Sequence, residues 1–203
     1  MQIKLLEGPM GLDSALVGLG LNYYLTSPCE SIEDFYSEDG LKERISKVAC
    51  RLASRGNGEN KWLRAVYYSW LVEAPRFLWA EIDTYKISTV AQSESTMRLS
   101  SIAKGWHFSD DDFEGGYMDS FVLSKLNILL DTFRANPKDT DLLLKLKSAL
   151  PESFLQRRVW SCSLAVMQNV WRQRRAHRLP MWHTVCDAFV EATPEWLREA
   201  VYG

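Results

Sequence analysis

A strand-like run that turns directly into a helix is the feature that most limits how this chain can fold. Residues 65–72 are rich in β-branched and aromatic side chains, which favour a strand. The tripeptide Glu73-Ala74-Pro75 then breaks the run, and Arg76 opens a helical pattern that ends near Asp83. A strand and a helix placed so close together predict mixed α+β structure.

The remaining elements are also mixed. A short strand is expected over 3–6, and apolar residues at helical spacing predict helices over 13–23, 41–52, 121–133, 141–150 and 182–189. Thr193 as N-cap with Pro194 at the first helical position predicts a last helix from 194 onward. The stretch 152–179 contains neither proline nor glycine and predicts one long helix that Pro180 ends. No internal repeat is present. We therefore expect a single α+β domain over residues 1–203, with a small sheet flanked by helices and a long C-terminal helix.

Composition limits the function classes. A chain of 203 residues with 46% hydrophobic content can bury one sizeable core, and its net charge of −2 gives no bulk attraction to nucleic acid or membranes. Its four cysteines lack a Cys-x-x-Cys pair, which favours reduced core thiols over zinc or disulfide sites. No apolar run reaches the roughly 18–20 residues of a membrane span, and the start lacks a signal-peptide pattern. We expect a cytoplasmic protein.

The densest polar stretch of the chain, TYKISTVAQSESTMR at 84–98, directly follows the helix that Arg76 opens. It combines hydroxyl side chains with Lys86, Gln92 and Glu94. A buried hydroxyl without a partner costs about 1–3 kcal/mol, so these groups face either water or a polar ligand. The residues alone leave both interpretations open.

A second polar cluster is basic and lies on the predicted long helix. Its members are Arg157, Arg158, Arg172, Arg174, Arg175, His177 and Arg178, and most of them fall outside an apolar stripe at steps of three and four residues. Positive charge at a helix end is favourable and ordinarily solvated. Alternatively, some of the guanidinium groups hold a phosphate through paired hydrogen bonds, a geometry that suits arginine.

Other motifs give no support to several common chemistries. The acidic segment 109–116 lacks the ligand spacing of a calcium loop and is expected to be a solvated helix start or a lid loop. The histidines His107, His177 and His183 lack the spacing of a metal site, so we expect no bound metal. No glycine-rich phosphate loop, His-Glu-x-x-His or Gly-x-Ser-x-Gly motif is present, which leaves dinucleotide folds, zinc hydrolases and serine esterases without support.

Taken with its flanks, the polar segment resembles the signature of the flavin-dependent thymidylate synthases. That family has a strand and a Pro-Arg-led helix, then an Arg-His-Arg triplet and a Ser-x-Asn-Glu-x-Ser-x-Arg-Tyr run. Here Pro75-Arg76 matches the helix start and Thr84-Tyr85-Lys86 falls on the triplet. Thr89 falls on the first serine, Ala91-Gln92 on Asn-Glu and, after one inserted residue, Ser95 on the second serine.

The resemblance continues on both sides of this segment. Residues 3–24 are similar to the family's opening strand and helix. Downstream, Leu150-Pro151 matches a Leu-Pro pair, Ser163 and Ala165 fall on an Asn-x-Arg pair, and Gln173-Arg174 falls on a Leu-Arg pair. The layout is most similar to a diverged, phage-type member with degenerate flavin motifs, which would work in the cytoplasm of the host cell.

The resemblance implies a homotetramer with active sites between subunits. It also implies binding of FAD and dUMP, with NADPH and methylenetetrahydrofolate used to methylate or hydroxymethylate the base. Ser95 is the candidate catalytic residue, and the candidate nucleotide-binding residues are Thr89, Gln92, Glu94, Ser95, Arg174 and Arg178. The candidate flavin contacts are Tyr85, Lys86 and Arg174. Arg174 is the first candidate for a phosphate contact.

Departures from the family pattern support a second hypothesis. The cationic triplet is Thr84-Tyr85-Lys86 here, and the Asn-x-Arg pair is Ser163-Leu164-Ala165. Each lost charge-assisted contact is worth about 1.5–3 kcal/mol. The chain would then keep the fold and a nucleotide-sized pocket without flavin chemistry. It would bind a nucleotide, a nucleic acid or another protein, for example as a sequestering or inhibitory phage protein.

Overall fold

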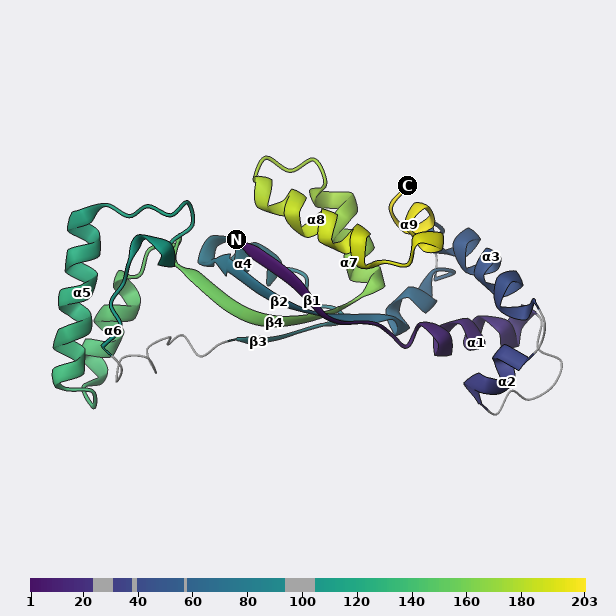
Figure 1. Ribbon diagram of the computed structural model, residues 1–203, viewed down its shortest axis with the longest axis horizontal. Helices are drawn as coiled ribbons and strands as arrows, with labels where there is room; N and C mark the ends of the chain where they lie inside the picture. The colour runs from purple at the N-terminus through teal and green to yellow at the C-terminus, as the bar shows by residue number, and fades with distance from the viewer. Residues whose placement is uncertain (24–30, 38–39, 57, 94–104) are drawn as a thin grey trace. The chain divides into compact units, whose positions relative to one another are not determined.

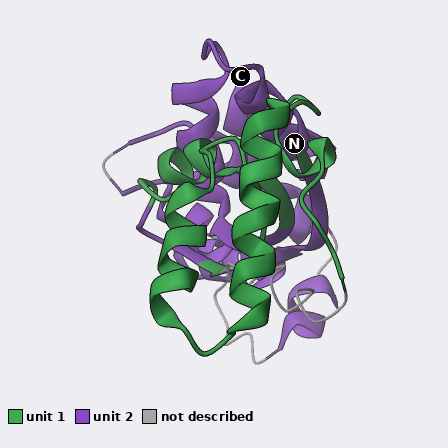
Figure 2. Ribbon diagram, turned by 90° about the vertical axis from the view of Figure 1, so that its left-hand side faces the viewer, with its two compact units in different colours: residues 1–2, 71–85, 91–159 green, residues 3–70, 86–90, 160–203 purple. Residues whose placement is uncertain are grey.

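The computed structural model of the chain describes residues 1–23, 31–37, 40–56, 58–93 and 105–203 (Figure 1). The chain divides into two compact units whose segments alternate in sequence (Figure 2). Unit 1 comprises residues 1–2, 71–85 and 91–159, and unit 2 comprises residues 3–70, 86–90 and 160–203. The single domain expected over residues 1–203 stays a prediction.

A four-stranded sheet has the strand order β1-β2-β4-β3. The strands are β1 (Gln2–Met10), β2 (Tyr67–Pro75), β3 (Thr89–Ser93) and β4 (Leu155–Ser163). Along β2, Tyr68, Trp70 and Val72 are buried, whereas Tyr67 and Leu71 are 36% and 37% exposed. Because side chains alternate along a strand, β2 has one face toward the core and one open face.

Unit 2 is largely helical. Its helices are α1 (Leu12–Tyr23), α2 (Ile32–Ser37), α3 (Leu41–Ala53), α7 (Leu164–Arg174), α8 (Pro180–Ala192) and α9 (Glu195–Tyr202). Trp70 packs on Phe189 of α8 with ring centroids 5.2 Å apart. The buried amide nitrogen of Gln168 in α7 donates to the carbonyl oxygens of Ala53 (2.9 Å) and Val201 (3.1 Å). This one side chain ties α7 to α3 and α9.

Unit 1 contains α4 (Arg76–Ile82) and a helical hairpin made of α5 (Ser120–Ala135) and α6 (Thr140–Ala149), which lie side by side (Figure 1). Each hairpin helix begins at an aspartate whose carboxylate accepts two backbone N–H groups, Asp119 for α5 and Asp139 for α6. The hairpin and its flanking segments bury their own apolar core, made of Phe108, Phe113, Leu126, Leu130, Phe133, Leu146, Leu150 and Phe154.

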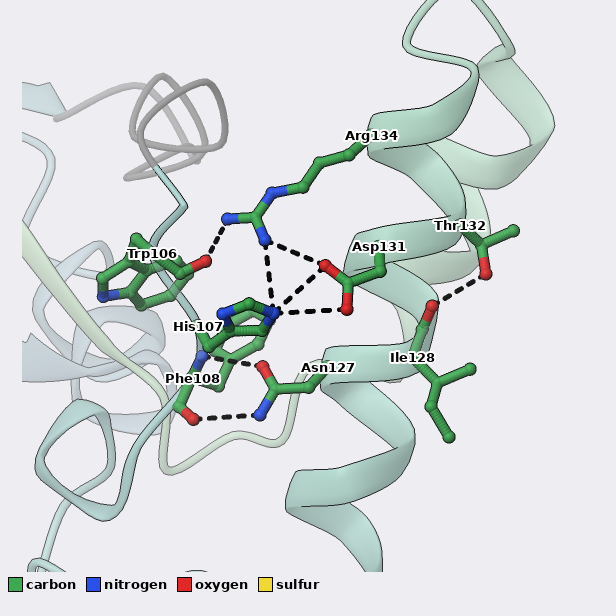
Figure 3. A network of polar contacts seen from close by, with 8 residues as sticks. All are labelled: Trp106, His107, Phe108, Asn127, Ile128, Asp131, Thr132 and Arg134. Atoms are coloured by element: carbon green, nitrogen blue, oxygen red, sulfur yellow. Dashed lines mark hydrogen bonds and ion pairs between the residues drawn. The ribbon is translucent and has the colours of Figure 1, made fainter.

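A polar network holds the segment before this core against α5 (Figure 3). The Asn127 side chain accepts the N–H of Phe108 at 2.8 Å and donates to its carbonyl oxygen at 3.0 Å. The carboxylate of Asp131 lies 3.1 Å from Nε2 of His107 and 2.9 Å from Nη1 of Arg134. Arg134 also donates to the carbonyl oxygen of Trp106. The network therefore fixes residues 106–108 through both backbone and side-chain contacts.

The α+β class, the small sheet and most expected elements are confirmed. The strands expected over 3–6 and 65–72 lie in β1 and β2, and the expected helices correspond to α1, α3, α4, α5, α6, α8 and α9. Helix α8 begins at Pro180, the residue expected to end a longer helix. Proline suits that position because the first turn of a helix leaves its N–H groups without intrahelical partners.

The prediction of one long C-terminal helix over 152–179 is wrong. Residues Leu155–Ser163 form strand β4, and within the span predicted as one helix only Leu164–Arg174 are α-helical, as α7. Ser163 ends the strand and caps the helix, because its hydroxyl oxygen accepts the N–H of Val166 at 3.4 Å. The absence of proline and glycine does not distinguish a helix from a strand, because either element can lack both residues. Trp160 and Cys162, both buried and two residues apart, fit the alternation of a strand.

The acidic segment at 109–116 is a capped helical turn. The backbone N–H and the hydroxyl of Ser109 donate to one carboxylate oxygen of Asp112 at 2.9 and 3.0 Å, and Asp112 is only 4% exposed. A short 3₁₀ helix, Asp110–Asp112, forms on this cap. The helix start expected for the segment is therefore present, and its innermost carboxylate is committed to the cap rather than to solvent.

Candidate functional site

A hollow in unit 1 is lined by residues from three strands. Leu71 comes from β2, Gln92 from β3, and Arg157, Arg158 and Val159 from β4. Its volume is about 360 Å³, which lies within the roughly 300–1,000 Å³ of small-molecule sites. Leu71 and Val159 supply apolar surface, and the amide and guanidinium groups supply hydrogen-bond donors. The hollow suits a small, partly apolar ligand that carries acceptor atoms.

Arg158 is held firmly beside this hollow. Its guanidinium carbon lies 4.3 Å from the ring centre of Trp79, a fully buried residue of α4. Nη1 donates to both carboxylate oxygens of Asp83, at 3.1 and 3.0 Å, and Nη2 donates to the side-chain oxygen of Gln156 at 3.2 Å. Only 17% of the Arg158 side chain is exposed. Its Nε is buried and has no hydrogen-bond partner within the part of the chain that is described.

Arg157 is more loosely held than its neighbour. Its side chain is 47% exposed, and its Nε lies 3.7 Å from a carboxylate oxygen of Glu73, whose side chain is 20% exposed. At this separation the contact is an ion pair rather than a well-formed hydrogen bond. An ion pair this exposed contributes less than about 1 kcal/mol to stability.

Basic side chains also collect at the C-terminal end of α7, in unit 2. The guanidinium carbon of Arg174 lies 4.8 Å from the ring centre of Trp182, and that of Arg175 lies 4.3 Å from the ring centre of Trp171. Trp182 is fully buried, so it offers Arg174 a fixed surface. An aromatic ring attracts a guanidinium group without neutralising its charge, and the helix end favours cations as well.

The structure places four of the predicted nucleotide-binding residues. Thr89 and Gln92 lie on β3, and Gln92 lines the hollow. Arg174 is the last residue of α7, and Arg178 is exposed shortly beyond it. The predictions for the other two, Glu94 and Ser95, fall outside the described residues. A site shared by Ser95 and Arg174 therefore stays a prediction.

The candidate flavin contacts follow α4. Tyr85 is partly buried, and its backbone N–H donates to the carbonyl oxygen of Ile82 at 3.0 Å. Lys86 is exposed. Thr84, the first residue at the triplet positions, donates its hydroxyl to the carbonyl oxygen of Glu81 at 2.7 Å. The triplet positions thus present one cationic side chain.

Two arginines lie elsewhere than the sequence predicts. Arg157 and Arg158 are expected on the same helix as Arg174, whereas the structure places them on β4, at the same hollow as Gln92. The signal that could have found them is the adjacent Val159-Trp160 pair, because β-branched and aromatic residues favour strands. Once β4 is recognised, its arginines can be separated from the basic end of α7.

The described residues offer little support for metal or thiolate chemistry. They contain no group of three histidine, cysteine, aspartate or glutamate side chains that could hold a metal. Burial raises the pKa of Cys162, and it raises the pKa of Cys186 to about 11. Both thiols therefore stay protonated at neutral pH, and a thiol is a poor nucleophile in that form. None of the helices in the described ranges is long and apolar enough to cross a membrane.

Comparison with known proteins identifies the fold. No family model and no curated protein matches the chain. It is similar to the crystal structure of flavin dependent thymidylate synthase ThyX from Helicobacter pylori complexed with FAD and dUMP, with a TM-score of 0.69, 16% identity and coverage of 100% of both chains. A second structure of ThyX from Helicobacter pylori, with FAD and dUMP, has a TM-score of 0.67 and 17% identity over 99% of this chain and 97% of that chain. The ThyX-like fold expected from the resemblance is confirmed.

Proposed function

We propose that this protein binds a pyrimidine deoxynucleotide, dUMP, on the ThyX-like fold. The observation that carries the proposal is the likeness over the whole chain to two ThyX structures that hold dUMP together with FAD. The hollow in unit 1 and the basic end of α7 support it, because each combines aromatic or apolar surface with guanidinium groups. A nucleotide needs both kinds of surface, one for its rings and one for its phosphate.

The proposed nucleotide contacts are polar residues of β3, of the segment after it, and of the end of α7. They are Thr89, Gln92, Glu94, Ser95, Arg174 and Arg178. Ser95 is the candidate catalytic residue if the protein is an enzyme. Stacking on Trp182 uses the face of the Arg174 guanidinium group, and its N–H donors lie in the plane of that group, where an anion can accept them.

Flavin binding is supported less well by the residues present. A clamp for the FAD pyrophosphate needs several cations, and the triplet positions supply only Lys86, with the Thr84 hydroxyl donating to the helix before it. These residues do not fit the flavin, and we derive no chemical step through it. Methylation or hydroxymethylation of the base with FAD, NADPH and methylenetetrahydrofolate, with Tyr85, Lys86 and Arg174 at the flavin, stays a prediction.

The same triplet favours a second candidate function. A protein that keeps the nucleotide site but lacks the flavin clamp would act as a non-catalytic binder, which sequesters a nucleotide or inhibits a partner. The two functions differ in one readily measured property. An enzyme of this kind carries flavin, which colours the protein yellow. The binder is colourless and takes up no added FAD.

Calorimetry with dUMP tests the proposal, with UMP, dTMP and dCMP as comparison ligands. We expect saturable binding of dUMP, and discrimination against UMP if the sugar is recognised. Absorbance of the purified protein, before and after addition of FAD, then assigns it to the enzyme or to the binder. If none of the four nucleotides binds, the ThyX-like fold stands without nucleotide binding, and the proposal is wrong.

Assembly and cellular location are further parts of the proposal. We propose a homotetramer, because the resemblance implies active sites between subunits and closed symmetric oligomers are the common form of such assemblies. Light scattering at micromolar concentration measures the mass directly, and a monomer would contradict the proposal. A phage origin and a place in the cytoplasm stay predictions from the sequence.

A further inference from the structure

We propose that two exposed arginines at the end of α7, Arg172 and Arg175, bind the backbone of a single-stranded nucleic acid. Arg172 lies in the last turn of α7, and Arg175 is the residue that caps this helix. The surface is distinct from Arg174 and Arg178, which are assigned above to a mononucleotide. The proposal does not depend on the binding of dUMP.

The positive charge at this helix end exceeds what the helix and a mononucleotide need. The stretch 169–183 contains four arginines and no acidic residue. The C-terminal end of a helix carries only about half a negative charge. A mononucleotide has a single phosphate, and each guanidinium group can donate two hydrogen bonds to it, so Arg174 and Arg178 supply enough donors. A polymer supplies further phosphates, which Arg172 and Arg175 can bind.

Arg175 lies over an aromatic ring that is itself held in place. Its guanidinium carbon lies 4.3 Å from the ring centre of Trp171, and its backbone N–H donates to the carbonyl oxygen of Trp171 at 3.0 Å. Trp171 packs on the buried Tyr202 of α9, with ring centroids 5.5 Å apart. Because the ring already orders the guanidinium group, less conformational freedom is lost when a ligand binds.

Base stacking favours a single strand over an acidic peptide as the ligand. Arg175 is exposed, so an unpaired base can stack on the side of its guanidinium group that faces away from Trp171. The N–H donors in the guanidinium plane remain for a phosphate. Arg172 precedes Arg175 by three residues, which makes the two side chains neighbours on the helix surface and lets them contact neighbouring phosphates. An acidic peptide offers carboxylates to the donors but no ring to the stacking surface.

The attraction is local, because the whole chain has a net charge of −2. Charges are screened over about 10 Å at 0.1 M salt, so only phosphates close to the two arginines contribute. Affinity for a single strand falls with salt at a log–log slope of about −0.7 for each phosphate contact. With two or three such contacts, we expect a slope between about −1.4 and −2.1.

Fluorescence anisotropy on the full chain tests the proposal, with a labelled oligo-dT of about 20 nucleotides, which is longer than a typical single-strand site. The variants are Arg172→Ala, Arg175→Ala and Arg175→Lys, each checked for folding by circular dichroism. Arg55→Ala is the matched control, because it also removes one exposed arginine from unit 2, and Arg55 has a carboxylate partner in Glu59. Unlabelled oligo-dT, an abasic strand, polyglutamate and dUMP serve as competitors.

The expected losses separate stacking from charge. Arg175→Ala should weaken oligo-dT binding about 10-fold and Arg172→Ala about threefold, since Arg175 contributes both a stacking surface and a charge. Arg175→Lys should weaken it about fivefold, because lysine keeps the charge but has no planar group. Each alanine variant should make the salt slope shallower by about 0.7, whereas an arginine that only stabilises the helix end leaves the slope unchanged.

The competitors test the class of ligand. The abasic strand and polyglutamate should compete about 10-fold less well than unlabelled oligo-dT, because neither offers a base to Arg175. Saturating dUMP and the control Arg55→Ala should each change oligo-dT binding less than about twofold.

Several outcomes would overturn the proposal. The original chain fails to bind oligo-dT at low salt, or Arg172→Ala and Arg175→Ala bind it as the original chain does. Polyglutamate that competes as well as oligo-dT would assign the surface to an acidic protein instead. Displacement of the strand by dUMP would place the strand at Arg174 and the mononucleotide site. Calorimetry with dUMP tests the proposed function separately, so the failure of one proposal is distinguished from the failure of the other.

Discussion

The arginines of β4 and of α5 have different partners from the arginines at the end of α7. In unit 1, arginines stand opposite carboxylates: Arg158 and Asp83 at 3.0 Å, Arg157 and Glu73 at 3.7 Å, Arg134 and Asp131 at 2.9 Å. In unit 2, arginines at the end of α7 lie over indole rings. The sequence between Asn169 and His183 contains four arginines and no acidic residue.

These arginines differ in how closely a carboxylate approaches them. Arg158 and Arg174 both lie over a fully buried tryptophan, so stacking alone does not separate a structural arginine from a binding one. Arg158 has its terminal donors committed to Asp83 and Gln156. Arg157 lies farther from its carboxylate partner, with its Nε 3.7 Å from an oxygen of Glu73, and its side chain is 47% exposed. The two neighbouring arginines of β4 therefore differ in how closely a carboxylate approaches them, at 3.0 Å for Arg158 and 3.7 Å for Arg157.

The largest expected effects concern the two tryptophans that support the stacked arginines. Trp79→Ala and Trp182→Ala should each lower the free energy of unfolding by about 3–5 kcal/mol, because both rings are fully buried. Trp79→Ala also removes the hydrogen bond that the indole N–H donates to the carbonyl oxygen of Gln156 at 3.0 Å. Trp196→Ala is the control, since that ring is 40% exposed.

Urea unfolding followed by circular dichroism measures all three variants. If Trp182→Ala lowers the free energy of unfolding no more than Trp196→Ala does, Trp182 is not the rigid support of Arg174 that its burial indicates. The ring would then be a poor platform for Arg174, and the basic end of α7 would be an ordinary solvated helix end.

Binding tests the α7 side of the comparison. We expect Arg174→Ala to weaken the binding of a phosphorylated ligand by about 2–5 kcal/mol. The Arg174 side chain is partly buried and lies over Trp182, and a guanidinium group can donate two parallel hydrogen bonds to a phosphate. Lys86→Ala should cost less than about 1 kcal/mol, since that side chain is exposed. Calorimetry with dUMP and FAD measures both. Equal losses in the two variants would contradict a special role for Arg174.

The contribution of the Arg158–Asp83 ion pair in unit 1 can be measured as a change in the free energy of unfolding. Asp83→Ala should lower the free energy of unfolding by about 1 kcal/mol, because a mostly buried guanidinium loses two hydrogen bonds while the carboxylate itself is 51% exposed. Glu59→Ala, which removes the exposed partner of Arg55, should cost only about 0.3 kcal/mol. The unfolding midpoint in urea compares the two. Equal costs would show that Asp83 adds nothing to the contacts of Arg158 with Trp79 and Gln156.

The fold was largely predictable from the sequence because its elements have strong local signals. Aromatic and β-branched density gives β2, and Asp119 and Asp139 are typical caps for the two hairpin helices. Strand β4 was not predictable in the same way. Its apolar residues also match helical spacing, and its pairing partners β2 and β3 are far away in the sequence.

The candidate site was predictable only in part for the same reason. Gln92 was found from the polar density around it, and Arg174 from a motif position. The meeting of Gln92 with Arg157 depends on β3 and β4 lying next to each other in the sheet, and the stacking of Arg174 on Trp182 depends on how α8 packs on α7. Contacts between segments distant in sequence leave no periodic signal.

The smallest expected effect is on stability and concerns Asp131 of α5, whose carboxylate contacts both His107 and Arg134. Hydrogen bonds from His107 and then Arg134 lower the pKa of Asp131 from its ordinary value (Figure 3). A carboxylate with a lowered pKa contributes stability above its unfolded pKa of about 3.9, and the contribution is lost as the pH falls through the lower folded value. Asp131→Asn should therefore reduce stability at neutral pH, and the difference from the original chain should vanish in acid.

Thr132→Ala is the control on the same helix, because it removes a neutral hydrogen bond to the carbonyl oxygen of Ile128, and its cost should not change with pH. Urea unfolding at a series of pH values measures both, and a pH-independent Asp131→Asn cost would show that the network stabilises the hairpin without its charge.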